Sequence, residues 1–462
     1  MRLVEFLTTV LTFSTLAACN PIGFHAHKRF SYGGSVSDSY DFIIIGGGQA
    51  GLTLASRLSE DSNHTVLVIE AGDSGDAVIN QIATPSAAYF NSLTKSSYDW
   101  QYVTAPQTHL SNRPLSWPRG KVLGGSSAIN GMYNVRPAEI EVNAWSNAIA
   151  PEDSSLASLW DWDAMFAAMD KSETFTAPSD SVKEMAGIEY NVASHGSSGP
   201  IHASYPGYTF PQIGDWNKAL SAVGVYLNPD SASGQNWGAY VPNSFINPTN
   251  WTRSYSRSGY IDPLPARSNL QILVNSTVTR ILFDTSSSNN LTATGVEYST
   301  DSTTHSVKVN KEVILSAGAV ARRVSPQILQ LSGVGPSDVL QAAGVTVLSE
   351  LPGVGQHLQD HLSTVVAWST TAQTAADIAA SGSDTAKTAK FLSYVNSATA
   401  YINASILFNG DAGVATFQQQ VNDALESSAS SLVPSSSSEV IAGYKAIYNL
   451  TANTILPARS AK

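Results

Sequence analysis

The 462-residue chain has little of what several protein classes require, namely cysteine and charge. Its only cysteine, Cys19, excludes an intrachain disulfide and argues against a cysteine-based metal site or nucleophile. Charged residues make up 13% of the chain, its formal net charge is −11, and no basic run interrupts the sequence. A nucleic-acid surface needs clustered Lys and Arg, so we expect no nucleic-acid partner. With 43% hydrophobic residues, the chain is long enough for about two or three core-forming units.

Long apolar runs are also rare, and the clearest one lies at the N-terminus, from Phe6 to Ala18. This run is too short and too rich in threonine for a membrane-spanning helix, so we expect no stable membrane insertion. Residues 1–18 have the layout of a secretory signal peptide, which predicts a secreted protein that begins near Cys19. A buried N-terminal helix and a lipoprotein cleavage box at Leu16–Cys19 are the alternatives. Glycosylation sequons favour secretion, and they lie at Asn63, Asn250, Asn275, Asn290, Asn403 and Asn449.

A dinucleotide-binding turn is predicted near residue 46. The apolar run Phe42–Ile45 is typical of a buried parallel strand, and a Gly-x-Gly-x-x-Gly turn with helical spacing follows it. Such a turn lets the backbone approach a pyrophosphate at a helix N-terminus. A second apolar run, Val66–Ile69, ends in Glu70, near the spacing at which an acid binds ribose hydroxyls. The predicted cofactor residues here are Gly46, Gly48, Gln49, Ala50, Gly51 and Glu70. An ordinary βα turn is the alternative, and this stretch leaves FAD and NAD both open.

The stretch Gly120–Asn130, GKVLGGSSAIN, is rich in glycine and serine and offers unhindered backbone N–H groups. It resembles the first signature of the glucose-methanol-choline (GMC) oxidoreductases, and the chain resembles fungal aryl-alcohol oxidase and glucose oxidase-like members of that family. This resemblance implies FAD as the cofactor. It also implies further contact residues, which are Arg119, Gly120, Val122, Gly125, Ser126, Asn130, Gly131, Met132, Tyr133 and Val278. Asn134 departs from the family, which usually has an aromatic or similar residue there.

Family likeness covers most of residues 40–455 and implies an α/β fold. The expected architecture is a Rossmann-like FAD-binding domain with a second, discontinuous α+β substrate-binding domain. The FAD-binding domain would comprise residues 38–134 and 253–364, and the substrate-binding domain residues 135–252 and 365–462.

Local patterns add four expectations. Alternation from Leu270 to Leu282 predicts strand. Ala321–Val324 looks inserted relative to the second family signature. Ser325 and Pro326 are typical of a helix N-cap and the first helical residue, and Gly333 of a helix end. Ser427–Ser438 is predicted to be an exposed serine-rich loop.

The chain has nine histidines, and none follows His361. By resemblance, the general base of the family is a histidine in a C-terminal segment, so we expect this segment to be missing and the substrate-binding domain to be incomplete. No catalytic residue is therefore assigned, and His357 or His361 as a substitute base is the alternative. The resemblance implies hydride transfer from a small alcohol or sugar to flavin N5, with O2 or a quinone as electron acceptor. A hydroxynitrile lyase-like relative and a non-catalytic truncated flavoprotein remain as alternatives.

Overall fold

The computed structural model describes residues 30–32, 36–286, 291–320, 324–361, 363–395, 398–433 and 435–458. Four features predicted from the sequence lie outside these ranges: the signal peptide 1–18, Cys19, the sequon Asn290, and residues 321–323 of the insertion.

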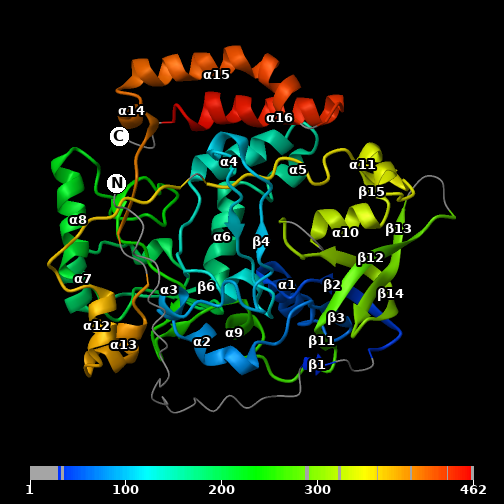
Figure 1. Cartoon of the computed structure of the whole chain (residues 1–462), viewed down its shortest axis with the longest axis horizontal. Helices are drawn as coiled ribbons and strands as arrows, with labels where there is room; N and C mark the ends of the chain where they lie inside the picture. The colour runs from blue at the N-terminus through cyan, green and yellow to red at the C-terminus, as the bar shows by residue number, and fades with distance from the viewer. Residues whose placement is uncertain are drawn as a thin grey trace.

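The main sheet of the described residues has seven strands, which come from residues 30–69 and 270–315 (Figure 1). Its strand order is β1-β11-β3-β2-β14-β13-β12, and the first five strands in this order run parallel. The predicted strands are confirmed, although the alternating stretch from Leu270 breaks into two strands at Asn275, whose φ of +53° interrupts the extended backbone. The strands are β1 (Phe30–Tyr32), β2 (Ser39–Ile45), β3 (Val66–Ile69), β11 (Leu270–Val274), β12 (Ser276–Asp284), β13 (Thr292–Thr300) and β14 (Thr303–Leu315).

Each face of the parallel strands is buried by a different layer. On one face, helix α1 (Gln49–Leu58) packs Leu52 and Ala55 against Ile44 and Val68 of the sheet. On the other face, Ile43 and Ile45 pack with residues of β12 and β13 and with helix α10 (Ser325–Leu331). Strands covered on both faces explain the uninterrupted apolar runs in the sequence.

Strand β14 connects the two kinds of pairing. Its first half pairs antiparallel with β13, and its second half pairs parallel with β2, with an irregularity between Val309 and Glu312. This bend carries the antiparallel strands β12 and β13 over the face of the parallel strands, where Val278 and Val296 are buried.

Shorter strands and most helices form the remainder of the chain. Eight helices and three strand pairs come from residues 70–269, between the two parts of the sheet. The strands outside the main sheet are β4 (Tyr102–Val103), β5 (Ser116–Trp117), β6 (Glu173–Thr176), β7 (Ile201–Ser204), β8 (Gly238–Tyr240), β9 (Ile246–Asn247), β10 (Thr252–Arg253), β15 (Val334–Gly335), β16 (Ser349–Glu350) and β17 (Thr399–Tyr401). The further helices are α2 (Ile79–Ala83), α3 (Ala87–Phe90), α4 (Glu139–Ile149), α5 (Ser154–Ala157), α6 (Trp162–Ser172), α7 (Asp180–Ala186), α8 (Pro211–Ala222), α9 (Ser256–Tyr260), α11 (Ser337–Ala342), α12 (Ala375–Ser381), α13 (Ala389–Leu392) and α14 (Ala404–Leu407).

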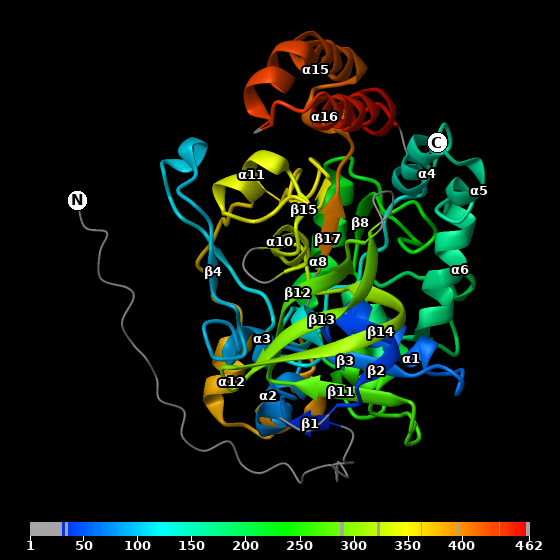
Figure 2. The ribbon, with the colours of Figure 1, turned by 90° about the vertical axis from the view of Figure 1, so that its right-hand side faces the viewer.

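Helices α15 (Asp411–Leu432) and α16 (Ser438–Leu450) form a hairpin at the outside of the molecule (Figure 2). The prediction of a loop from Ser427 to Ser438 was wrong for residues 427–432, which continue α15, and for Ser438, which begins α16. Helix packing overrides the serine content, because Ala429 and Tyr444 are buried between the two helices. The serine hydroxyls are accommodated by bonds to carbonyls of the preceding turn, as from Ser431 to Ser427.

Helix α10 begins one residue earlier than predicted. Val324 is its N-cap and Ser325 its first residue, while the Ser325 hydroxyl accepts a hydrogen bond from the Ala317 N–H instead of capping the helix. Gly333 ends this segment with a φ of +85°, as predicted. No helix in the described part of the chain is long and apolar enough to span a membrane.

Candidate cofactor site

A cavity of about 760 Å³ lies at the carboxyl ends of the parallel strands, where open α/β sheets bind ligands. Strands β2, β3 and β14 each end beside it, at Ile45, Ile69 and Leu315. Its volume is within the range of roughly 300–1,000 Å³ that small-molecule and cofactor sites occupy. The predicted residues that line it are Gly46, Gly48, Gln49, Ala50, Glu70, Arg119, Gly120, Gly125, Ser126 and Val278.

The turn from β2 into α1 forms the inner end of the cavity. Gly48 is the N-cap of α1 and makes no side-chain cap, so the first backbone N–H groups of the helix face this end. Gly51 does not line the cavity, and its role is packing. A Cβ at this position would lie 2.0 Å from the Gly46 carbonyl oxygen, so only glycine lets the helix approach the strand this closely.

The second glycine-rich loop lies against the first. Gly125 has a φ of +54°, and a Cβ there would lie 2.8 Å from the Gly48 Cα atom. The two loops therefore meet through backbone at Gly48 and Gly125, and glycine backbone forms part of the cavity wall. Such a wall is the kind of surface that accepts a pyrophosphate and its ribose groups at close range.

Glu70 provides the acidic group of the cavity. Its Oε2 accepts a hydrogen bond from the Gly47 N–H at 2.7 Å, and its Oε1 accepts one from the Gly72 N–H at 2.7 Å. Burial raises the pKa of Glu70, and the bonds from Gly72 and Gly47 oppose this shift. Each oxygen keeps a second lone pair, so the carboxyl group can still accept hydrogen bonds from a ribose.

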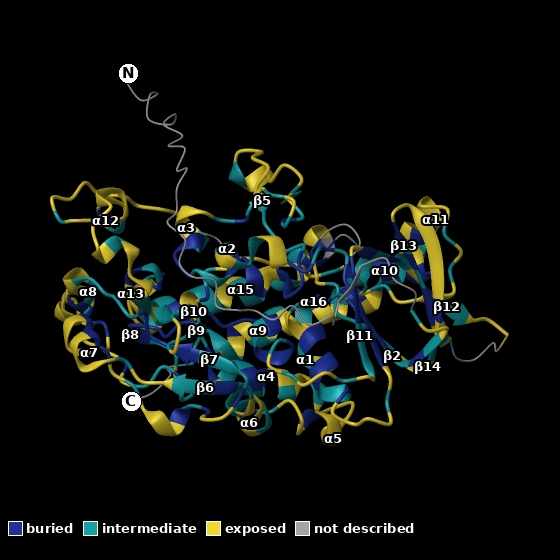
Figure 3. Ribbon diagram, turned by 90° about the horizontal axis from the view of Figure 1, so that it is seen from below, coloured by how far each residue is buried: buried dark blue, intermediate teal, exposed yellow. Residues whose placement is uncertain are grey.

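Aromatic residues form the wall that sequence reasoning missed. Trp100, Tyr102 and Trp117 line the cavity from the base of the β4–β5 hairpin. Trp100 and Tyr102 stack with ring centroids 5.7 Å apart. Asp99 holds the base of the hairpin, because its Oδ1 accepts hydrogen bonds from the backbone N–H groups of Gln101 and Arg119. Figure 3 shows the tip of the hairpin, near β5, as exposed. The strand-like spacing of Trp100 and Tyr102 was the available signal.

Five further predicted residues are not part of the cavity lining. Val122 is fully buried in a cluster with Ile82 and Tyr255. Met132 packs with Ile246 and Val395. The others that do not line the cavity are Asn130, Gly131 and Tyr133. Flavin contact by these five residues stays a prediction.

Buried Arg253 holds the loop that contains Asn130. Its guanidinium donates to the carbonyls of Ser127 and Asn130 and to the Asn130 side chain, at 2.7–3.1 Å. Burial lowers the pKa of Arg253 to about 10. The cation is therefore still charged at neutral pH, and it anchors the chain directly after the second glycine-rich loop.

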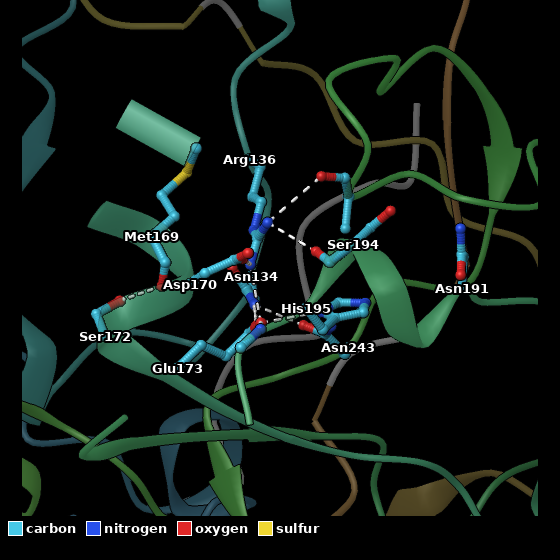
Figure 4. A network of polar contacts seen from close by, with 12 residues as sticks. Asn134, Arg136, Met169, Asp170, Ser172, Glu173, Asn191, Ser194, His195 and Asn243 are labelled. Atoms are coloured by element: carbon cyan, nitrogen blue, oxygen red, sulfur yellow. Dashed lines mark hydrogen bonds and ion pairs between the residues drawn. The ribbon is translucent and has the colours of Figure 1, made fainter. Parts of the chain in front are cut away.

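A buried polar network follows this loop (Figure 4). The Arg136 guanidinium bonds to Glu173 at 2.8 Å and to Asp170 at 3.1 Å. Glu173 also contacts the His195 Nδ1 at 2.9 Å. Asn134, the residue that departs from the family, donates to the Asn243 side chain at 2.7 Å and lies on the edge of this network. Its side chain is thus engaged outside the cavity.

No described histidine lines the cavity. His357 stacks on Tyr444 of α16 with ring centroids 5.8 Å apart, although its neighbours Leu358 and Gln359 do line the cavity. His361 is exposed. The described residues also contain no cluster of three or more His, Cys, Asp or Glu that could hold a metal ion.

Comparison with known sequences points to one family. A family model for GMC oxidoreductases matches residues 40–363. The chain is 43% identical over 424 residues to the GMC oxidoreductase family protein Mala s 12 of Malassezia sympodialis, covering 91% of this chain and 66% of that protein. It is 36% identical over 328 residues to an oxygen-dependent choline dehydrogenase of Pectobacterium atrosepticum, covering 70% and 53%. The chain thus spans between half and two thirds of the length of these relatives.

Solved structures agree in fold. An FAD-dependent oxidoreductase from Chaetomium thermophilum superposes with a TM-score of 0.74 at 32% identity, covering 90% of this chain and 70% of that one. A fungal aryl-alcohol oxidase superposes with a TM-score of 0.76 at 27% identity, covering 92% and 72%. The family match, the strand order and the two glycine-rich loops lead to the same conclusion: the chain belongs to the GMC oxidoreductase family.

Proposed function

We propose that the chain binds FAD in the cavity at the end of β2 and β3. The observation that supports this most directly is the close meeting of two glycine-rich loops beside a buried carboxylate. Gly46–Gly51 and the Gly125 loop would hold the pyrophosphate, and Glu70 the adenosine ribose. Val278 lines the cavity near Glu70 and would hold the adenine. An acid at the ribose position disfavours a 2′-phosphate, as expected for FAD.

The reaction class that we propose is oxidation of an alcohol or sugar CH–OH group, with O2 or a quinone as electron acceptor. FAD would supply the hydride acceptor when bound. The chain's own residues would bind and orient the dinucleotide through the two loops, while the wall of Trp100, Tyr102 and Trp117 limits water access from one side.

We further propose that turnover by this 462-residue chain is weak or absent. Alcohol oxidation needs a general base within hydrogen-bond reach of the hydroxyl proton, and a base contributes about 10²- to 10⁴-fold. No described histidine lines the cavity, which supports this proposal. Substrate addition without O2 tests it: an alcohol-oxidising enzyme bleaches the flavin, whereas a lyase-like relative or a non-catalytic flavoprotein keeps its yellow colour. Loss of bleaching in His357→Ala or His361→Ala would instead identify the substitute base.

Titration of the purified chain with FAD tests the cofactor assignment. Hydrogen bonds to charged groups contribute about 1.5–3 kcal/mol, so we expect Glu70→Ala to weaken FAD binding by roughly 10- to 150-fold. Glu297→Ala, which removes an acid from an ion pair on β13, serves as the control and should bind FAD like the wild type. Equal affinity of Glu70→Ala and wild type would contradict the assignment, and Glu70→Gln separates binding from folding because it keeps one acceptor for the backbone amides.

We also propose that the protein is secreted and glycosylated, and that residues 38–134 with 253–364 form the FAD-binding domain. Among the described sequons, Asn63, Asn250, Asn275 and Asn449 are exposed, which supports glycosylation. Expression in a secreting eukaryotic host, followed by glycosidase digestion and intact mass measurement, tests it; an unprocessed N-terminus and no mass shift would contradict it.

A further inference from the structure

The second glycine-rich loop has an uncommon backbone conformation at its start. Gly124 and Gly125 follow each other with φ values of +100° and +54°, and Gly125–Ala128 then forms a short 3-10 helix. Gly125 and Ser126 line the cavity, while the Gly124 N–H donates to the Gly47 carbonyl of the first loop at 2.8 Å. The backbone conformation of Gly124 therefore decides how the two loops meet.

Two buried serines that do not line the cavity fix the Gly124 carbonyl. The Ser127 hydroxyl donates to this carbonyl at 2.6 Å, and the Ser256 Oγ lies 3.1 Å from the Ser127 Oγ. Because a hydroxyl has one proton and Ser127 uses it for the carbonyl, Ser256 is the donor between the two serines. The Ser256 Oγ also lies 3.4 Å from the Gly124 carbonyl oxygen, and Ser256 is 2% exposed.

The residues before Ser256 contact the same loop. Tyr255 is 3% exposed, and a Cβ on Gly124 would lie 2.6 Å from the Tyr255 ring, so this ring packs directly on the loop backbone. Arg253 holds the other end of the loop through the carbonyls of Ser127 and Asn130. Arg253, Tyr255 and Ser256 thus hold residues 124–130 at three points. We call residues 253–256 the clamp.

We propose that the clamp positions the second loop for FAD, with Ser256 acting through Ser127 on the backbone of Gly124. This inference rests on the proposed FAD site. Neither serine lines the cavity, so their effect on FAD has to pass through the loop backbone at Gly125 and Ser126. Adjacent glycines have the greatest conformational freedom when nothing holds them. A loop that is fixed before binding avoids the free-energy cost of being ordered by the ligand, which increases affinity.

FAD titration of full-length variants that lose one hydroxyl tests the proposal. We expect Ser256→Ala and Ser127→Ala each to weaken FAD binding by roughly 2- to 10-fold, the effect of one hydrogen bond. Ser393→Ala is the matched control, because Ser393 is fully buried and its hydroxyl also bonds to two backbone groups, at Lys390 and Gly207, which belong to neither loop. This variant should bind FAD like the wild type even if its stability falls. Unchanged affinity of Ser256→Ala, or an equal loss in Ser393→Ala, would overturn the proposal.

The double variant tests whether Ser256 acts through Ser127. We expect Ser127→Ala/Ser256→Ala to weaken FAD binding by less than the product of the two single effects, because removal of Ser127 already breaks the connection to the carbonyl. Single effects that multiply in the double variant would contradict this connection.

Hydrogen–deuterium exchange of the FAD-free chain measures the loop without the cofactor. Peptides that contain residues 124–130 should exchange faster in Ser256→Ala than in the wild type, and at the wild-type rate in Ser393→Ala. Unchanged exchange in Ser256→Ala would overturn the clamp whether or not FAD binds. A wild-type chain that takes up no FAD would instead contradict the cofactor proposal, so the two failures are distinguishable.

Discussion

Loss of the Glu173 charge should destabilise the protein strongly. The Glu173 side chain is 6% exposed and that of Arg136 is 7% exposed, so the pair is shielded from water. Breaking a buried ion pair by removing one partner costs about 3–5 kcal/mol, because the other charge stays buried. In Glu173→Gln, Arg136 keeps its bonds to Asp170 and to the Ser194 carbonyl. We therefore expect a loss near the lower end, about 3 kcal/mol in the free energy of unfolding.

The pH dependence of this effect has a defined sign. Burial alone would raise the pKa of Glu173, but the hydrogen bond and charge of His195 and the charge of Arg136 outweigh it, so the pKa is lowered. A lowered folded-state pKa means that the contribution is complete above the ordinary pKa of a glutamate, about 4.3, and is lost as the pH falls through the folded-state value. The difference between wild type and Glu173→Gln should thus be full at pH 7 and shrink below about pH 4.3.

Urea unfolding followed by tryptophan fluorescence measures both quantities. Glu297→Gln is the control, because the Arg280 side chain in its ion pair is 53% exposed and such surface pairs contribute about 0–1 kcal/mol. The double variant Arg136→Met/Glu173→Leu should be more stable than Glu173→Gln, because it removes the uncompensated charge. A loss below about 1 kcal/mol for Glu173→Gln would refute the reasoning, since that magnitude is typical of exposed pairs.

Three further changes follow from local geometry. Gly51→Ala should prevent folding or FAD binding, because its Cβ would lie 2.0 Å from the Gly46 carbonyl oxygen. Gly443→Ala on α16, where a Cβ meets open space, should instead raise the free energy of unfolding measured with urea by about 0.5–1 kcal/mol. Tyr240→Phe should leave the thermal midpoint unchanged or raise it, because the buried Tyr240 hydroxyl has no hydrogen-bond partner among the described residues; a clear drop would reveal one. Asp99→Ala should release the base of the β4–β5 hairpin, which limited proteolysis can detect as faster cleavage there, and weaken FAD binding in titration.

Periodicity along the chain predicted the parallel strands and the first glycine turn, because these features are encoded locally. The apolar runs of β2 and β3 are continuous since both faces of the sheet are covered, and that pattern is visible in the sequence. The serine-rich stretch was misjudged for the opposite reason. Composition at Ser427–Leu432 favoured a loop. Ala429 is instead buried against α16, a separate helix that follows the connection after α15, and local composition does not reveal such a contact.

The cavity shows the same division between local and distant causes. Gly46, Gly48 and Glu70 could be predicted because a turn and a strand end fix their positions. The spacing of Trp100 and Tyr102 indicated a strand, but the place of the aromatic wall beside the cavity could not be predicted. It depends on Asp99 accepting backbone hydrogen bonds from Gln101 and Arg119, on the two sides of a hairpin. Tyr133 and Asn130 follow the second loop in sequence, yet side chains from distant segments decide where that part of the chain lies. Arg253, more than a hundred residues later, bonds to the Asn130 carbonyl at 2.7 Å and so fixes the direction of that carbonyl.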